Sequence, residues 1–182
     1  MRKTSVIFFT LLLFTSCATS LSSLYSFDYP LTSKKVYSKN TNLSVNIPKG
    51  WFTAEDNECN CIDLWLIKDD FSQSLIFSII NVDEKTKNDI RKSGIQKLVE
   101  YNKIFTRAKL GKEFKGFLNE ENFIIGNQRF FAYQYHDNRD EIVRVVIFQL
   151  NNWFYELTAI SKDSNNNEEL WVIQNTVLTS IN

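Results

Sequence analysis

The amino-acid sequence predicts an α+β domain built on an antiparallel sheet. Residues 122–160 form a pattern typical of a β-meander, in which apolar side chains alternate and short polar turns recur. Residues 88–110 carry a helical apolar stripe, and a second stripe closes the chain. The 182 residues include only 5 Gly and 2 Pro, which disfavours a disordered or loop-dominated protein.

The chain opens with a short targeting segment. Arg2 and Lys3 precede the apolar run 6–14, which is too short to span a bilayer. The run Leu-Phe-Thr-Ser-Cys at 13–17 resembles the bacterial lipobox, in which a signal peptidase cuts before a cysteine that carries lipid. We therefore expect residues 1–16 to be removed and Cys17 to be lipidated. The alternative is an ordinary signal peptide with an accidental cysteine.

The residue after Cys17 bears on which membrane holds the protein. A lipobox cysteine receives two or more acyl chains, which together give stable anchoring. In lipoproteins, an Asp at the next position favours the inner membrane, so Ala18 indicates the outer membrane. No acidic run follows Cys17, and we therefore expect the periplasmic face rather than the cell surface.

Charge argues against a nucleic-acid partner. The chain has 21 basic and 21 acidic residues, and loss of 1–16 would remove Arg2 and Lys3, which leaves a nearly neutral protein. Nucleic-acid binding demands a basic face. The expected partners are the membrane, through the N-terminal lipid, and a protein of the cell envelope.

The first elements follow a predicted tether. Residues 17–39 are rich in Ser, Thr, Tyr and Lys without a sustained period, and we expect them to form a flexible tether before a domain at 40–182. A strand at 43–47 ends in a turn at 48–50, after which Trp51 is expected to cap the core. Strands at 62–68 and 74–82 follow.

The main helix is predicted over 88–110 and ends at Gly111. One half of its helical wheel is apolar, with Ile95, Leu98, Val99, Tyr101, Phe105 and Ala108. The opposite half carries the basic side chains, which we interpret as a solvated face.

The meander comprises four predicted strands and two tight turns. Gly126-Asn127 and Asn151-Asn152 are two-residue turns suited to positive φ. The strands are expected at 122–125, 128–136, 141–150 and 153–160. A closing helix at about 166–180 follows, with Glu168 and Glu169 near its positive N-terminus.

Two stretches of the sequence resemble PsbP-like domains. They are NLSVNIPKGW at 42–51 and FFAYQYHDNRDEIVRVVIFQLNNWFYELTAIS at 130–161. The resemblance implies a central antiparallel sheet with helices packed on both faces, an α/β/α sandwich. It also implies a protein that binds or supports partners without being an enzyme. The matching residues are core-packing positions, so no functional residue is carried over.

Cys59 and Cys61 are the first candidate site. Their Cys-Asn-Cys spacing departs both from the usual zinc spacing and from the redox Cys-x-x-Cys motif. A local disulfide in an oxidising compartment, a pair of free thiols, and a metal or redox site all remain open. A disulfide would need a turn or bulge at Asn60, since residues i and i+2 of a strand lie at the edge of disulfide geometry.

His136 is the second candidate. With Asp137 or Asp140 it could form a His–carboxylate pair for base catalysis, but these residues occupy a predicted turn and no nucleophile motif accompanies them. The sequence therefore predicts a non-enzymatic binding or assembly-support module without metal or cofactor. The alternative is a small envelope hydrolase, or a redox or metal protein, that uses His136 or the cysteine pair.

The alternating aromatics of the meander allow two interpretations. Half of them must face the core, and the others could form an exposed partner patch. Helices on both sheet faces would instead bury them all. They are Phe130, Phe131, Tyr133, Tyr135, Phe148, Trp153, Phe154 and Tyr155.

Overall fold

The computed structural model describes residues 27–55, 61–162 and 167–182. The predicted signal peptide, Cys17, Ala18 and Cys59 lie outside these residues, so their processing and pairing stay predictions. Within the described residues, no helix combines the length and apolar character needed to cross a membrane.

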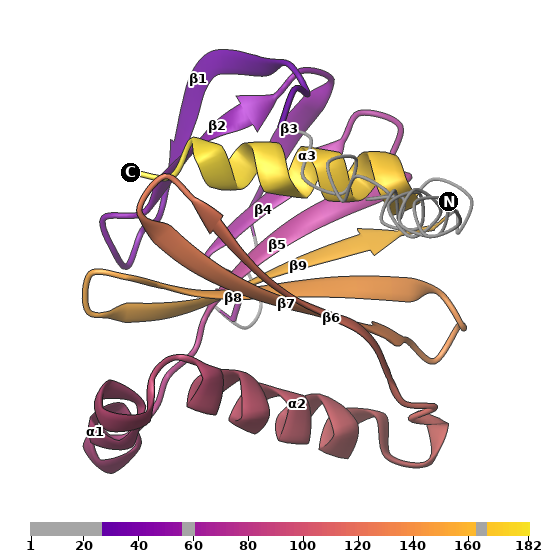
Figure 1. Cartoon of the computed structure of the whole chain (residues 1–182). Coiled ribbons are helices and arrows are strands. Elements are labelled where there is room, and N and C mark those ends of the chain that lie inside the picture. The colour runs from indigo at the N-terminus through magenta and orange to yellow at the C-terminus, as the bar shows by residue number, and fades with distance from the viewer. Residues whose placement is uncertain (1–26, 56–60, 163–166) are drawn as a thin grey trace, which may run out of the picture.

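A seven-stranded sheet, antiparallel throughout, forms the centre of the domain (Figure 1). Its order is β3-β4-β5-β9-β8-β7-β6, so β8 and β9 lie in its interior. The strands are β3 (Trp51–Ala54), β4 (Leu64–Lys68), β5 (Gln73–Ile79), β6 (Phe117–Ile125), β7 (Gln128–His136), β8 (Ile142–Leu150) and β9 (Trp153–Ser161). The predicted hairpins are confirmed, because Ile125 pairs with Gln128 and Leu150 with Trp153 across two-residue turns.

Helices cover both faces of this sheet, as the resemblance to PsbP-like domains implies. α3 (Asn167–Thr179) lies on one face, and α1 (Glu84–Ser93) and α2 (Gln96–Leu110) lie on the other (Figure 1). A two-stranded sheet of β1 (Leu31–Tyr37) and β2 (Ser44–Pro48) lies on the side of α3.

Strand alternation divides the core into two clusters. On the side of α3, Phe148 and Leu157 pack with Ile173 and Val177 of the helix. On the opposite side, the cluster includes Val145 of β8 and Leu98 of α2. Both clusters exclude water, so burial of apolar surface on each sheet face stabilises the fold.

One charged side chain is fully buried in the α3 side of the core. Arg144 of β8 is 1% exposed, and its guanidinium donates to Gln174 Oε1 at 2.6 Å and Asn175 Oδ1 at 2.9 Å. It also forms an ion pair with Glu121 of β6 at 3.1 Å. A buried cation is tolerated only when its donors are satisfied in this way.

The prediction of a single helix over 88–110 is wrong in its N-terminal part. Two helices occupy this stretch, because Gly94 adopts φ 83° and its N–H caps Ile90 O at 2.7 Å. Asp83 caps α1 by accepting from Thr86 N at 2.7 Å. The predicted end is confirmed, since α2 ends at Leu110 and Gly111 caps it with positive φ.

The predicted tether at 17–39 also needs correction, because part of it is folded. β1 pairs with β2 in register Tyr37↔Ser44. The side chains of β1 are mostly exposed, so its sequence shows no alternation of apolar and polar residues. Its composition therefore resembles that of a linker. A further strand, β3, begins at Trp51, which is buried in the core as expected.

We expect Val145→Asp to unfold the domain. Val145 is 1% exposed in an interior strand, and an unpaired buried carboxylate costs several kcal/mol. Urea denaturation followed by circular dichroism measures the loss of stability. Gln149→Asp, at an exposed position of the same strand, is the matched control and should leave the midpoint nearly unchanged. Equal midpoints for both variants would contradict the interior position of Val145.

Candidate functional site

His136 lies at the end of β7 beside an exposed turn. Its Nδ1 is 3.1 Å from Asp140 Oδ1, so one of the two predicted His–carboxylate pairs forms. The same carboxylate accepts from Lys115 Nζ at 2.5 Å. Asp137 instead accepts backbone N–H groups of the turn, from Arg139 at 2.8 Å and Glu141 at 3.0 Å. These contacts shape a surface turn and place no nucleophile against the imidazole.

Cys61 is exposed and disulfide-bonded. Its predicted partner Cys59 lies outside the described residues. Cys61 borders a cavity of about 410 Å³ together with Asp63 and Trp153. Trp153 lies at one end of the β8–β9 pair, whereas His136 pairs with Ile142 at the other end of β8. The structure therefore does not bring Cys61 and His136 together.

Metal ligation finds no support within residues 27–55, 61–162 and 167–182. No group of three or more His, Cys, Asp or Glu side chains in these ranges is arranged to hold an ion.

A larger cleft lies between α2 and the sheet, and sequence reasoning did not identify it. Its volume is about 600 Å³. Five of its lining side chains are apolar or aromatic and seven are polar, and four of the polar ones are charged. The lining residues are Asn102, Phe105, Thr106, Lys109, Leu110, Glu113, Tyr135, Asp137, Asn138, Val143, Glu156 and Ile160.

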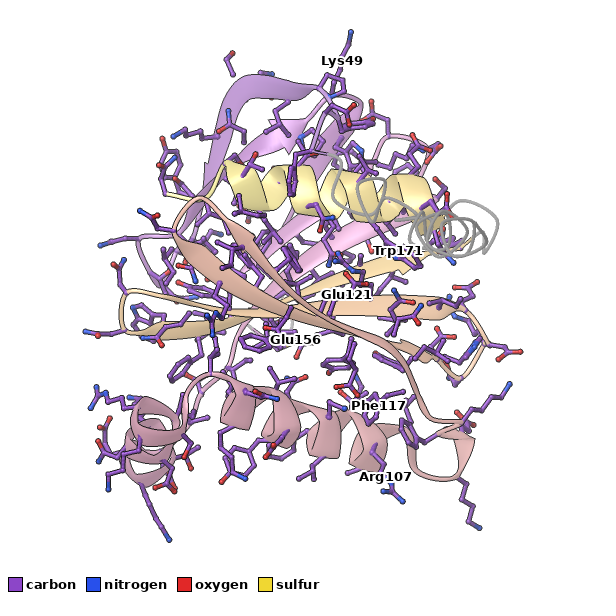
Figure 2. All side chains as sticks on the ribbon, viewed as in Figure 1. Lys49, Arg107, Phe117, Glu121, Glu156 and Trp171 are labelled. Atoms are coloured by element: carbon purple, nitrogen blue, oxygen red, sulfur yellow. The ribbon has the colours of Figure 1, made fainter. Side chains whose placement is uncertain are left out.

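Glu156 of β9 supplies a half-buried carboxylate to the cleft, on the sheet face toward α2 (Figure 2). It accepts from Asn102 Nδ2 at 2.6 Å and from Thr158 Oγ1 at 2.8 Å. Both donors are neutral, and no basic side chain of the described ranges forms an ion pair with it. The negative charge of this half-buried group is therefore hydrogen-bonded but not neutralised.

Behind Glu156, a buried network ties α2 to β7. Tyr133 donates a short hydrogen bond to Asn102 Oδ1, and its hydroxyl lies 2.9 Å from Thr106 Oγ1. Asn102 thus bridges Tyr133 and Glu156 through opposite ends of one amide, which orients it uniquely.

The pKa values of two tyrosines in and behind the cleft reflect its electrostatics. Burial, together with the Glu156 carboxylate, raises the pKa of Tyr135 to about 12. Burial and the same carboxylate raise the pKa of Tyr133 as well. Both phenols therefore remain neutral donors or apolar surface at physiological pH.

The aromatics of the meander form no exposed patch. Among the eight, only Trp153 is exposed, and the others are buried or half-buried. Exposed apolar surface occurs instead on α2, where Ile104 is 62% and Phe105 73% exposed. Phe105 belongs to the apolar half of the predicted helical wheel but is not part of the core, because it lines the open cleft in the C-terminal half of α2.

Stability should fall as pH rises above about 10. Between pH 10 and 12 the folded protein keeps protons on Tyr133 and Tyr135 that the unfolded chain loses, so the folded state binds more protons. The shift of Tyr135 alone corresponds to about 2–3 kcal/mol by pH 12. Urea denaturation across this pH range measures the slope. Tyr133→Phe should make the slope shallower, and an unchanged slope in this variant would contradict the assignment.

Comparison with solved structures confirms a PsbP-like fold. The solution structure of cyanobacterial PsbP (CyanoP) from Synechocystis sp. PCC 6803 aligns with a TM-score of 0.59 and 13% identity, over 82% of this chain and 91% of that chain. A crystal structure from Bacteroides thetaiotaomicron VPI-5482 aligns over 82% of this chain and 47% of that chain, with 15% identity and a TM-score of 0.38. No protein-family model and no curated protein matches the chain. At these identities the likeness shows the fold alone.

Proposed function

We propose that this protein is a lipid-anchored, non-enzymatic binding module that supports a protein complex at the periplasmic face of the outer membrane. The observation that carries the proposal is the pair Ile104 and Phe105, which are sequence neighbours on α2, whereas the other exposed large apolar side chains of the described residues have no such neighbour. Adjacent large apolar side chains in solvent are typical of a surface that a partner covers.

The charge around this pair indicates the chemistry of the partner. Residues 83–113 contain nine basic and five acidic side chains, although the whole chain has a net charge of zero. Arg107 points away from the sheet on the outer side of α2 (Figure 2). Lys109 and Lys112 are exposed nearby. We therefore assign the surface to a protein with an acidic rim around an apolar centre.

The position at which the described chain begins indicates that the α2 surface faces a protein partner and not the membrane that holds the lipid. Tyr29 N donates to Thr176 Oγ1 of α3 at 3.4 Å, so the described chain begins on the side of α3. The basic layer of α1 and α2 lies on the opposite face of the sheet (Figure 1). A lipid attached at Cys17 would thus hold the domain with the α2 surface free to meet a partner.

Processing at Cys17 is the first test. Mass spectrometry of the protein from its native membrane should find an N-terminal peptide that begins at acylated Cys17. Cys17→Ala should move the protein out of the membrane fraction, because the acyl chains supply the anchoring energy. An unmodified N-terminus, or a Cys17→Ala variant that stays with the membrane, would exclude the lipid anchor.

The docking surface is tested by site-specific photocrosslinking in the envelope. A crosslinker at Phe105 should give one discrete adduct with an acidic protein. Reversal of Arg107 and Lys109 to Glu should reduce the yield of this adduct about tenfold, since charges across the interface steer association.

The matched control places the crosslinker at Tyr37, which is 66% exposed on the β1–β2 side. This position should give no such adduct. A yield that is the same at both positions, an adduct indifferent to the charge reversal, or an adduct between two copies of this chain would count against the proposal.

A further inference from the structure

We propose that the cleft between α2 and the sheet binds an organic ammonium ion, a protonated amine on an apolar carbon stem. This inference concerns a small-ligand site and does not depend on the partner surface proposed above. Its volume of about 600 Å³ falls within the usual range for small-molecule sites.

The charges of the cleft favour a cation. Of the four charged lining residues, Glu113, Asp137 and Glu156 are acidic and Lys109 is basic. Asp137 already pairs with Arg139 at 3.0 Å, and Lys109 is exposed to solvent. Glu156 is the half-buried carboxylate whose donors, in the described part of the chain, are neutral. An ammonium group there would gain a charge-assisted hydrogen bond in surroundings of lowered dielectric.

The walls of the cleft suit the carbon stem of such a ligand. Val143 and Ile160 present apolar surface from the sheet, and Phe105 does so from α2. Phe105 and Tyr135 also present aromatic rings, which attract cations through their faces. A neutral apolar ligand would leave the Glu156 carboxylate without a counter-ion, and an anionic ligand would be repelled by it.

Titration of the full-length protein with n-pentylammonium, followed by NMR, tests the proposal directly. We expect saturable shifts at Asn102, Tyr135 and Val143. The neutral analogue 1-pentanol should bind about tenfold more weakly, because it cannot form the charged hydrogen bond with Glu156. Equal affinity for the two probes, or no saturable shift with pentylammonium, would overturn the proposal.

Variants separate the carboxylate from the general shape of the cleft. Glu156→Gln keeps an acceptor for Asn102 and should weaken pentylammonium binding about tenfold. Glu100→Gln, at an exposed carboxylate of α2 that does not line the cleft, is the matched control and should change it little. An effect of Glu100→Gln as large as that of Glu156→Gln would overturn the assignment.

A second pair of variants tests the cleft independently, in case Glu156→Gln fails to fold. Tyr135→Phe keeps the aromatic ring and should bind pentylammonium normally, whereas Tyr135→Leu removes the ring and should bind it several-fold more weakly. The thermal midpoint of each variant reports whether it folds. Equal affinities in two folded Tyr135 variants would remove the aromatic contribution from the proposal.

The same chemistry could come from a free amine or from a lysine side chain of a protein. Comparison of pentylammonium with Nα-acetyl-lysine N-methylamide distinguishes the two sources. Tighter binding of the lysine derivative supports a protein-borne cation, and tighter binding of pentylammonium supports a free amine. Both results uphold the ammonium site. If neither compound binds, the proposal is overturned.

Discussion

Burial of the interior strands on both faces is the constraint on which the rest of the fold depends. In β8, the side chains from Val143 to Phe148 are all buried, so neither face of the strand can meet water. A sheet of this kind needs a covering layer on each side. α3 with the β1–β2 hairpin supplies one layer, and α1 with α2 supplies the other.

The two layers cover the sheet to different extents, and the candidate site arises from this difference. α3 is buried along its length, and Gln174 and Asn175 reach Arg144 of β8, which fixes the helix relative to the sheet. α2 buries Leu98 and Val99 near its start but leaves Phe105 exposed. The C-terminal half of α2 therefore covers the sheet only in part: Thr106 contacts Tyr133 there, and the cleft lies open beside this contact.

Glu156 follows from the same asymmetry. It lies in an interior strand between the buried Tyr155 and Leu157, where a fully covered carboxylate would carry a large desolvation cost. The open end of α2 leaves it half-buried, and Asn102 supplies a hydrogen bond. Incomplete coverage thus makes a charge tolerable in the middle of the sheet.

The sequence was sufficient for those elements whose signal is local. Alternation and the two-residue turns at 126–127 and 151–152 predicted the meander, since both features act within a few residues. β1 was missed because an exposed strand that pairs with only one neighbour needs no apolar period. The break at Gly94 was missed because the apolar stripe continues across it, although the glycine itself was a visible signal.

The candidate site was less predictable, because it depends on distances between elements. Sequence reasoning singled out His136 and the cysteines, whose chemistry is evident from residue type alone. Asn102 and Glu156 lie 54 residues apart in sequence and come into contact only in the folded protein, where α2 crosses β9. The one local signal was a glutamate in the mostly apolar and aromatic run 153–160, where alternation places it on a buried face.

Two opposite charge preferences can coexist on this side of the molecule. Arg107 and Lys112 belong to the outer surface, where water and salt screen each charge within about 10 Å at 0.1 M ionic strength. Glu156 acts at short range inside a cleft with partly apolar walls, where screening is weaker and contact geometry decides. Under the two proposals, the outer surface would attract an acidic partner at long range, and the cleft would hold a cation by contact. Binding at the outer surface should depend strongly on salt, and binding in the cleft only weakly.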